Sequence, residues 1–347
     1  MVGRVSPPSL TALAAGQLVM LQIGLVGISA GAAAALLFAS VTSGTWMSVP
    51  LFYLAPLPIM IAGLGWSHWS ALVAAVAASA ALGAAFGGMF FIAFLAGAGL
   101  PAWWLGYLAL LARPGNETGV QGGIQGSLAA SAALEWYPPG RLVVWAAVLA
   151  ALIVVSGLLF IGTDAETVRA GLSKSMSALL RPETGATVPG SDKPDRVIEF
   201  LVMAIPPAAA VIATITSTFN LWLAGRIVTF SGRMTRPWPA LAEIEFPKMF
   251  TVALAVSIAL SFLDSLVGIV AGSLSAAILM AYGILGFAVL HAITRGIRAR
   301  PFVLGGVYGS VMIFGWPILA LCLLGISETA FDLRARAARK RGPPARL

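Results

Sequence analysis

The chain of 347 residues is poor in the residue types that soluble and metal-dependent proteins use most. It has a single cysteine, Cys322, which lies inside an apolar run. One cysteine excludes an internal disulfide framework and argues against a zinc cluster. Charged residues make up only 10% of the chain, whereas soluble domains carry about 25%. This composition is typical of a membrane protein.

Long apolar runs replace the missing charge, and hydrophobic residues account for 59% of the chain. Runs of about 20 apolar residues are typical of membrane-spanning helices, and the short alternating segments of a membrane β-barrel are not visible. Nine apolar segments can be drawn: Gln17–Val41, Val49–Gly65, Trp69–Ala85, Met89–Leu111, Leu142–Ile161, Val197–Leu223, Met249–Val270, Leu274–Ala292 and Phe302–Leu324. Because the uncharged block from Val49 to Leu111 can be divided in two ways, we predict an all-α, polytopic bundle of eight or nine transmembrane helices.

The polar connections suggest how a single integral membrane domain is organised. In the connection Gly162–Arg196, Thr163 and Glu166 have the spacing of a capping box. Apolar residues then recur at helical spacing opposite Arg169, Lys174 and Arg181, which predicts an amphipathic helix on the membrane surface. The predicted parts are an N-terminal helix block (1–112), a polar loop (113–141), a span (142–162), an amphipathic surface segment (163–196), a C-terminal helix block (197–328) and a basic tail (329–347).

The C-terminal tail concentrates positive charge. A basic tail beside a span is a topology signal or a contact for anionic lipids, which favours membrane lipids over nucleic acid as partners. We therefore expect a cytoplasmic tail. Arg295, Arg298 and Arg300 lie at the other end of the last segment, so both ends cannot be cytoplasmic if that segment crosses once. The basic residues of the tail are Arg334, Arg336, Arg339, Lys340, Arg341 and Arg346.

Three segments carry a resemblance to a known family: Pro56–Trp66, Glu135–Arg141 and Asn220–Pro239. Their order and spacing resemble the YybS-like family of predicted bacterial membrane proteins (domain of unknown function 2232), from about Leu18 to Ile326. The resemblance implies a bacterial inner (cytoplasmic) membrane location. Through the family's distant similarity to substrate-binding subunits of energy-coupling-factor transporters, it also implies a solute pocket and a separate energising partner.

Asp264 is the strongest single pointer to a functional site. It is the only charged residue in Met249–Val270, and Ser257, Ser261 and Ser265 accompany it in the same run. A carboxylate at membrane depth is costly, so it is expected to face a cavity or a polar partner. Asp264 would then bind a cationic solute, coordinate a coupling ion or carry a proton. The alternative is a structural hydrogen bond to a neighbouring helix.

Prolines suggest a second part of the pocket. Pro206 and Pro207 interrupt a segment that continues to Thr216 and Asn220, and Pro56 lies inside another segment. Proline removes a backbone donor and crowds the preceding turn, which predicts kinked or broken helices. Broken helices often line transport sites, although a bent helix with self-bonded hydroxyl groups is the alternative. The predicted substrate-binding residues are Asp264, Ser261, Asn220, Thr216, Pro206 and Pro56.

A basic, aromatic segment follows the proline-containing span. Arg226, Arg233 and Arg236 lie near Trp238, and arginine binds phosphate groups in a bidentate manner. These four residues are predicted to contact an anionic lipid or a partner protein. The alternative is a positively charged loop that only fixes the topology.

Catalysis has little support in the sequence. Ser29 lies in the pattern Gly27-Ile28-Ser29-Ala30-Gly31, but a nucleophile of this kind requires a strand-to-helix turn, and this one is expected in a helix. His291 could form a proton relay with Asp264 if their helices made a hairpin through 271–273. We predict no catalytic residue, no metal site and no cofactor, and we expect the protein not to be an enzyme.

Three functions remain in order of support. The first is binding or transport of a small solute within the bundle, driven by ion coupling or a separate motor because the chain has no nucleotide-binding motif. The second is a scaffold or assembly factor that binds a partner protein or an anionic lipid. The third and weakest is an intramembrane enzyme.

Overall fold

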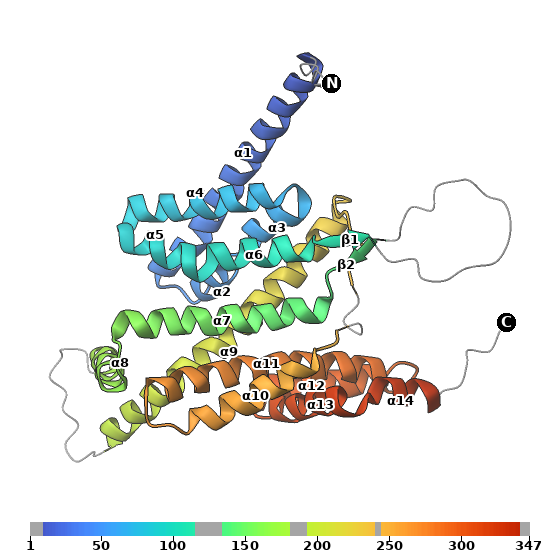
Figure 1. Ribbon diagram of the computed structural model, residues 1–347. Coiled ribbons are helices and arrows are strands. Elements are labelled where there is room, and N and C mark those ends of the chain that lie inside the picture. Colours follow the sequence, from blue (N-terminus) through green and yellow to red (C-terminus); the bar gives the residue numbers. More distant parts are fainter. Residues whose placement is uncertain (1–9, 115–133, 181–192, 240–243, 341–347) are drawn as a thin grey trace, which may run out of the picture. The chain divides into compact units, whose positions relative to one another are not determined.

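The computed structural model describes residues 10–114, 134–180, 193–239 and 244–340 (Figure 1). Helices dominate it, and seven helical segments of the described chain are long and apolar enough to cross a membrane. This confirms the predicted all-α, polytopic architecture. A short antiparallel ribbon joins β1 (Ala112–Pro114) to β2 (Leu134–Trp136). In this ribbon Arg113 faces Glu135 and forms an ion pair of 2.8 Å.

The chain divides into two compact units, which are described separately. Unit 1 comprises Met1–Tyr137 and Phe219–Trp238, and unit 2 comprises Pro138–Thr218 and Pro239–Leu347. The long helix α9 (Lys193–Phe230) contributes its first part to unit 2 and its second part to unit 1. The two units therefore do not coincide with the consecutive blocks drawn from the sequence.

Unit 1 is built around the packing of its first helix on its fourth. A Cβ atom added at Gly27 of α1 would lie 2.6 Å from Val73 of α4, and one added at Gly31 would lie 2.7 Å from the carbonyl oxygen of Ala74. Small residues therefore let these two backbones approach closely, as the GxxxG spacing predicts. The helices of unit 1 are α1 (Leu10–Ala39), α2 (Ser48–Tyr53), α3 (Leu57–Gly65), α4 (His68–Phe86), α5 (Gly88–Phe94), α6 (Leu100–Ala109) and the second part of α9.

Proline acts differently in the two segments that it interrupts. The break predicted at Pro56 is confirmed, because α2 ends at Tyr53 and α3 begins at Leu57. At Pro206 the helix does not break, since α9 continues through both prolines from Lys193 to Phe230, and the alternative of a kink there stays a prediction. Long helical stretches on both sides keep their backbone groups bonded, and lipid makes any further loss of hydrogen bonds costly.

Unit 2 is centred on α11, which packs against α7, α10 and α13. The rings of Phe246, Phe250 and Tyr282 meet in its core, and the hydroxyl groups of Tyr282 and Thr251 are 2.7 Å apart. The helices of unit 2 are α7 (Pro139–Ile161), α8 (Ala165–Leu180), the first part of α9, α10 (Lys248–Ser261), α11 (Leu266–Ile293), α12 (Arg300–Phe314), α13 (Ile318–Phe331) and α14 (Leu333–Lys340).

The boundary between two predicted spans is misplaced in the sequence analysis. The turn expected at 271–273 lies at 262–265, so α10 ends at Ser261 and α11 begins at Leu266. Ser265 caps α11, because its hydroxyl group accepts a hydrogen bond of 3.3 Å from the amide of Gly268. Aspartate and serine favour turns and helix N-caps, and this local preference outweighs the continuous apolar pattern.

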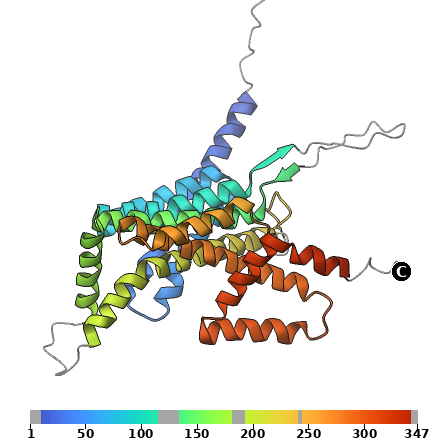
Figure 2. The same ribbon diagram turned by 60° about the horizontal axis from the view of Figure 1, so that its bottom comes forward.

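The last predicted span is a helical hairpin (Figure 2). Gly315, with φ +71°, and Pro317 separate α12 from α13. These helices have 15 and 14 residues, and each is about 22 Å long. That is shorter than the hydrocarbon core of about 30 Å. Phe302–Leu324 therefore does not cross as a single helix, and its prediction as one span is wrong.

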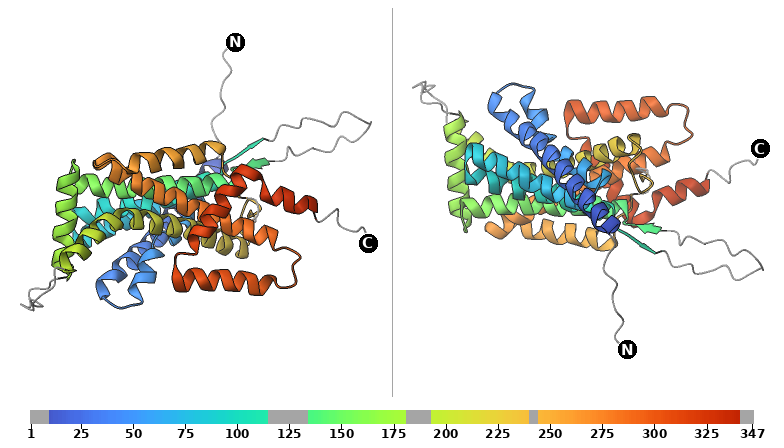
Figure 3. Two further views of the ribbon diagram at one scale, coloured as in Figure 1. Left: turned by 90° about the horizontal axis from the view of Figure 1, so that it is seen from below. Right: turned by 90° about the horizontal axis from the view of Figure 1, so that it is seen from above.

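The elements of unit 2 define two opposite ends. At the tail end, Glu245 precedes α10, packs on Gly140 of α7 and lies 3.9 Å from Arg334 of α14. The end of α11 and the start of α12 lie there too, since only residues 294–299 join them. At the other end, α8 crosses the end of α7 (Figure 3), with the turn between α10 and α11 nearby. We call it the hollow end, because a cavity lies there.

Candidate functional site

Asp264 lies in the turn between α10 and α11, at the hollow end of unit 2. Its side chain is 85% exposed. The expectation of a carboxylate within a membrane span is therefore wrong, because capping by the neighbouring Ser265 ends the helical run before it. Asp264 instead lies at the rim of a large hollow.

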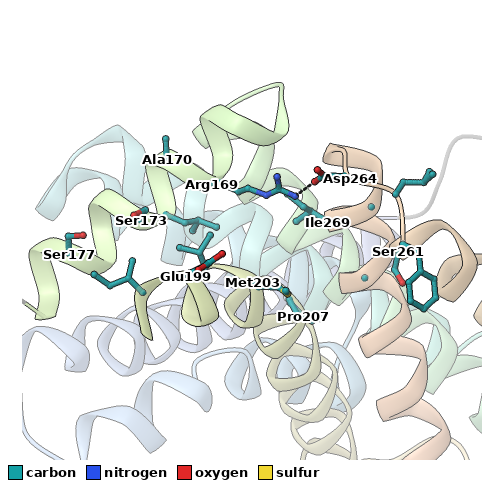
Figure 4. Close-up of a pocket in the computed structure, with 17 residues that line it drawn as sticks. Arg169, Ala170, Ser173, Ser177, Glu199, Met203, Pro207, Ser261, Asp264 and Ile269 are labelled. Atoms are coloured by element: carbon teal, nitrogen blue, oxygen red, sulfur yellow. Dashed lines mark hydrogen bonds and ion pairs between the residues drawn. The ribbon is translucent and has the colours of Figure 1, made fainter. Parts of the chain in front are cut away.

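The Asp264 hollow is a cavity of about 860 Å³ formed by α8, the first part of α9, the turn 262–265 and the start of α11 (Figure 4). Its lining combines charged, hydroxyl and apolar side chains from these four elements and from Ser261, the last residue of α10. All of them belong to unit 2. The lining residues are Arg169, Ala170, Leu172, Ser173, Ser177, Ile198, Glu199, Val202, Met203, Pro207, Ser261, Phe262, Leu263, Asp264, Gly268, Ile269 and Gly272.

An ion pair bridges the hollow between α8 and the turn. The guanidinium group of Arg169 donates to the carboxylate of Asp264 at 2.5 Å, and Figure 4 shows the two side chains pointing toward each other. The side chains are 48% and 85% exposed, and exposed pairs contribute only about 0–1 kcal/mol. The pair can therefore open at little cost in stability.

Glu199 of α9 adds a second carboxylate to the lining. Among the described residues it forms no ion pair. Neither Glu199 nor Arg169 is among the site residues predicted from the sequence. Glu199 is a carboxylate just inside the apolar segment Val197–Leu223. A carboxylate in such a segment is the same signal that pointed to Asp264, and it could have identified Glu199 as a site residue.

The prolines of α9 leave two backbone acceptors without donors in the same stretch of the helix. Proline carries no N–H group, so Pro206 and Pro207 leave the carbonyl groups of Val202 and Met203 without their usual helical donors. Val202 and Met203 both line the hollow. The charged side chains that line the hollow are thus two carboxylates and one guanidinium group.

Helix α8 carries Arg169 into the site, and its start is fixed by Asp164. The Asp164 carboxylate accepts hydrogen bonds from the Thr167 amide at 2.8 Å and from the Thr167 hydroxyl group at 2.6 Å. These bonds lower the pKa of Asp164 below its ordinary value. The cap is therefore Asp164 rather than the predicted Thr163. The amphipathic helix itself is confirmed up to Leu180, and Arg181 lies outside the described residues.

Only some of the predicted substrate-binding residues lie at the hollow. Ser261 lines it, with its hydroxyl group donating to the carbonyl of Ile258 at 2.7 Å. Pro206 is buried in α9 beside the lining residue Pro207. Thr216 lies further along α9 and is not part of the lining. The other two predicted residues, Asn220 and Pro56, belong to unit 1.

In unit 1, polar side chains hold helix ends together. The Asn220 amide donates to the carbonyl of Tyr53 at 2.8 Å, at the break before Pro56. Arg236 is 5% exposed and donates to the carbonyl of Ala109 at 2.6 Å, at the end of α6. A cation at the last carbonyl groups of a helix is stabilising.

The remaining predicted contact residues are more open. The guanidinium group of Arg233 lies 4.4 Å from the centre of the Trp66 ring, a cation–π contact. Trp238 packs on Gly225 of α9, and Arg226 is exposed. The three segments that carry the family resemblance therefore contact one another through Trp66, Arg233 and Arg236, the last of which lies 5.7 Å from the centre of the Trp136 ring.

The expected histidine–aspartate relay is wrong. Asp264 precedes the first residue of α11 and His291 lies in its last turn, so they are about 40 Å apart along the helix. Ser29 lies within α1 and donates to the carbonyl of Val26. Within the described ranges, no three His, Cys, Asp or Glu side chains gather as a metal site.

The long apolar helices and the polar hollow at their ends define a multi-pass membrane protein. Residues 31–328 match the family described as DUF2232, Predicted membrane protein, and the chain belongs to this family. No curated protein and no solved structure matches the chain. The implied likeness to energy-coupling-factor subunits stays a prediction.

Proposed function

We propose that this protein binds a small solute in the Asp264 hollow of unit 2. The observation that carries the proposal is the lining itself, in which Arg169, Asp264 and Glu199 converge on one cavity from three elements. A hollow with an apolar floor and a few converging polar groups is the usual form of a small-molecule site. The volume of about 860 Å³ lies within the usual range for such sites.

The charges at the two ends of unit 2 support an orientation in the membrane. Among the described side chains, eight basic residues lie at the tail end and three at the hollow end. Basic residues near span ends favour the cytoplasm, so the tail end is assigned to the cytoplasm of a bacterial inner membrane. The basic residues at the tail end are Arg141, Lys248, Arg295, Arg298, Arg300, Arg334, Arg336 and Arg339, and those at the hollow end are Arg169, Lys174 and Arg196.

This orientation removes the conflict between the tail and the loop at Arg295–Arg300. Both lie at the tail end because α12 and α13 fold back as a hairpin. The hollow then opens on the side opposite the cytoplasm, where it can capture a solute. Transport from there would require ion coupling or a separate energising protein, and the proposal includes no catalytic step.

The scaffold function has less support. Arg236 is occupied by backbone carbonyl groups and Arg233 by the Trp66 ring. Of the predicted contact arginines, Arg226 offers an exposed charge. Arg233 is exposed too, but its guanidinium group lies over the Trp66 ring, so we place solute binding first.

Native mass spectrometry of gently solubilised protein tests the proposal. The wild-type protein is expected to carry a small molecule that the Asp264→Asn variant loses, while the two proteins unfold at the same temperature once the ligand has been removed. Glu166→Gln is the matched control, because Glu166 is an exposed acid of α8 outside the hollow lining. Equal occupancy in Asp264→Asn and wild type would refute the assignment of the site.

Cysteine labelling tests the orientation. In a Cys322→Ser background, Ser173→Cys places a thiol in the hollow and Ala337→Cys places one on α14. A membrane-impermeant maleimide added to intact cells is expected to label the first and not the second. The reverse pattern would place the hollow on the cytoplasmic side.

A further inference from the structure

The hollow carries both signs of charge, which narrows the class of molecule that fits it. We propose that its occupant is a phospholipid whose headgroup joins a phosphate to an ammonium group; this inference rests on the proposed function. Arg169 would bind the phosphate, since guanidinium groups recognise phosphate oxygens. Asp264 and Glu199 would accept hydrogen bonds from the ammonium group.

The existing ion pair favours a zwitterion over a singly charged molecule. Arg169 and Asp264 already neutralise each other at 2.5 Å. A headgroup with both charges replaces this pair by two new ones and leaves neither side chain unpaired. An anionic headgroup would instead face two carboxylates, and a simple cation would face the guanidinium group.

Apolar residues around the charges favour a molecule with acyl chains. Met203 is 75% exposed, Phe262 84% and Leu263 50%, and all three line the hollow. They therefore present apolar surface both to the cavity and to its surroundings. A fully water-soluble solute would leave this apolar surface uncovered, whereas the upper part of an acyl chain would cover it.

The position of the hollow in the fold agrees with a headgroup. It lies where α10 ends and α11 begins, beside the amphipathic helix α8. Helices of this kind lie at the level of lipid headgroups. Val168 of α8 is fully buried while the adjacent Arg169 reaches the hollow, so α8 places a phosphate-binding group at that level.

Binding of defined lipids to the detergent-solubilised full chain tests this inference. Native mass spectrometry would measure the affinities of dihexanoyl phosphatidylethanolamine, dihexanoyl phosphatidylglycerol and free glycerophosphoethanolamine. The first is expected to bind at least about tenfold more tightly than the others, because phosphatidylglycerol loses a charge-assisted contact and glycerophosphoethanolamine loses the apolar contact of the acyl chains. Glu199→Gln is expected to lose the preference over phosphatidylglycerol, whereas Arg169→Gln is expected to weaken the binding of all three compounds and Arg169→Lys to keep part of it. Lys174→Gln, an exposed charge of α8 outside the lining, serves as the control.

Each other outcome overturns a separate part of the account. Equal binding of the lipid and free glycerophosphoethanolamine would refute the acyl-chain contact but leave solute binding in the hollow intact. Tighter binding of phosphatidylglycerol would refute the role of the two carboxylates. Lipid binding that no hollow variant changes would refute both this inference and the hollow as a binding site. Unchanged unfolding temperatures of the variants separate these outcomes from loss of folding.

Discussion

Polar side chains in the two units of this protein have opposite surroundings. In unit 1, Asn220 and Arg236 are buried and donate to backbone carbonyl groups at helix ends. In unit 2, Asp264 is exposed and Arg169 nearly half-exposed, and they pair across a large cavity. Buried groups of the first kind hold a fold together, because an unpaired polar group is costly away from water. Exposed groups of the second kind are available to a ligand.

The comparison predicts that unit 1 polar residues control stability. Replacing Arg236 by alanine would leave the carbonyl of Ala109 without its charged donor and open a cavity. We expect a loss of about 2–4 kcal/mol in the free energy of unfolding. Thermal unfolding in detergent checks this, with Arg226→Ala as the control, since Arg226 is exposed. Equal effects of the two variants would contradict the structural role of Arg236.

A smaller effect is expected for Asn220. The Asn220→Ala variant removes one hydrogen bond to the carbonyl of Tyr53 at the break before Pro56. The expected loss is about 1–2 kcal/mol, the cost of leaving one buried neutral acceptor unsatisfied. Chemical unfolding curves measure it. A change no larger than that of Ser29→Ala, an exposed position on α1, would show that this bond does not secure the break.

Hollow residues are expected to leave stability almost unchanged. Because the Asp264 side chain is largely exposed, Asp264→Asn should alter the free energy of unfolding of the ligand-free protein by less than about 0.5 kcal/mol. The same variant should lose the bound molecule. A stability loss as large as that of Asn220→Ala would mean that Asp264 is a structural residue, and the contrast between the units would fail.

The smallest effect concerns the cap of α8. Since hydrogen bonds from Thr167 lower the pKa of Asp164 from its ordinary value of 3.8, the carboxylate form is favoured in the folded protein. The cap is therefore fully present above about pH 4 and is lost as the pH falls through the lowered pKa. Hydrogen exchange at the start of α8 should quicken in acid relative to the rest of that helix. Asp164→Asn should abolish this dependence.

The sequence allowed the architecture to be predicted better than the site. Apolar runs identified most spans, since burial in lipid imposes a simple length and composition. The break at Pro56 was also predictable from proline chemistry. The turn at Asp264 and the hairpin at Gly315 were missed, because two helices separated by a short turn present one continuous apolar run.

The site could be predicted only in outline. Asp264 and Ser261 line the hollow as expected, but Arg169 and Glu199 come from elements that no sequence pattern brings together. Asn220 lies on the same helix, α9, as Pro206 and Pro207. The prolines belong to unit 2, however, whereas Asn220 belongs to unit 1. Tertiary packing decides which of two polar groups on the same helix lines a cavity.

The most direct test of the contrast between the units is ligand-induced stabilisation of two variants. Thermal unfolding would be measured with and without dihexanoyl phosphatidylethanolamine, because a ligand that binds only the folded state raises the unfolding temperature. We predict that Arg236→Ala unfolds at a lower temperature but keeps the lipid-induced rise, whereas Glu199→Gln unfolds at the wild-type temperature and loses it. If Glu199→Gln keeps the full rise, or Arg236→Ala loses the rise while remaining folded, the assignment of binding to unit 2 and of structural support to unit 1 is contradicted.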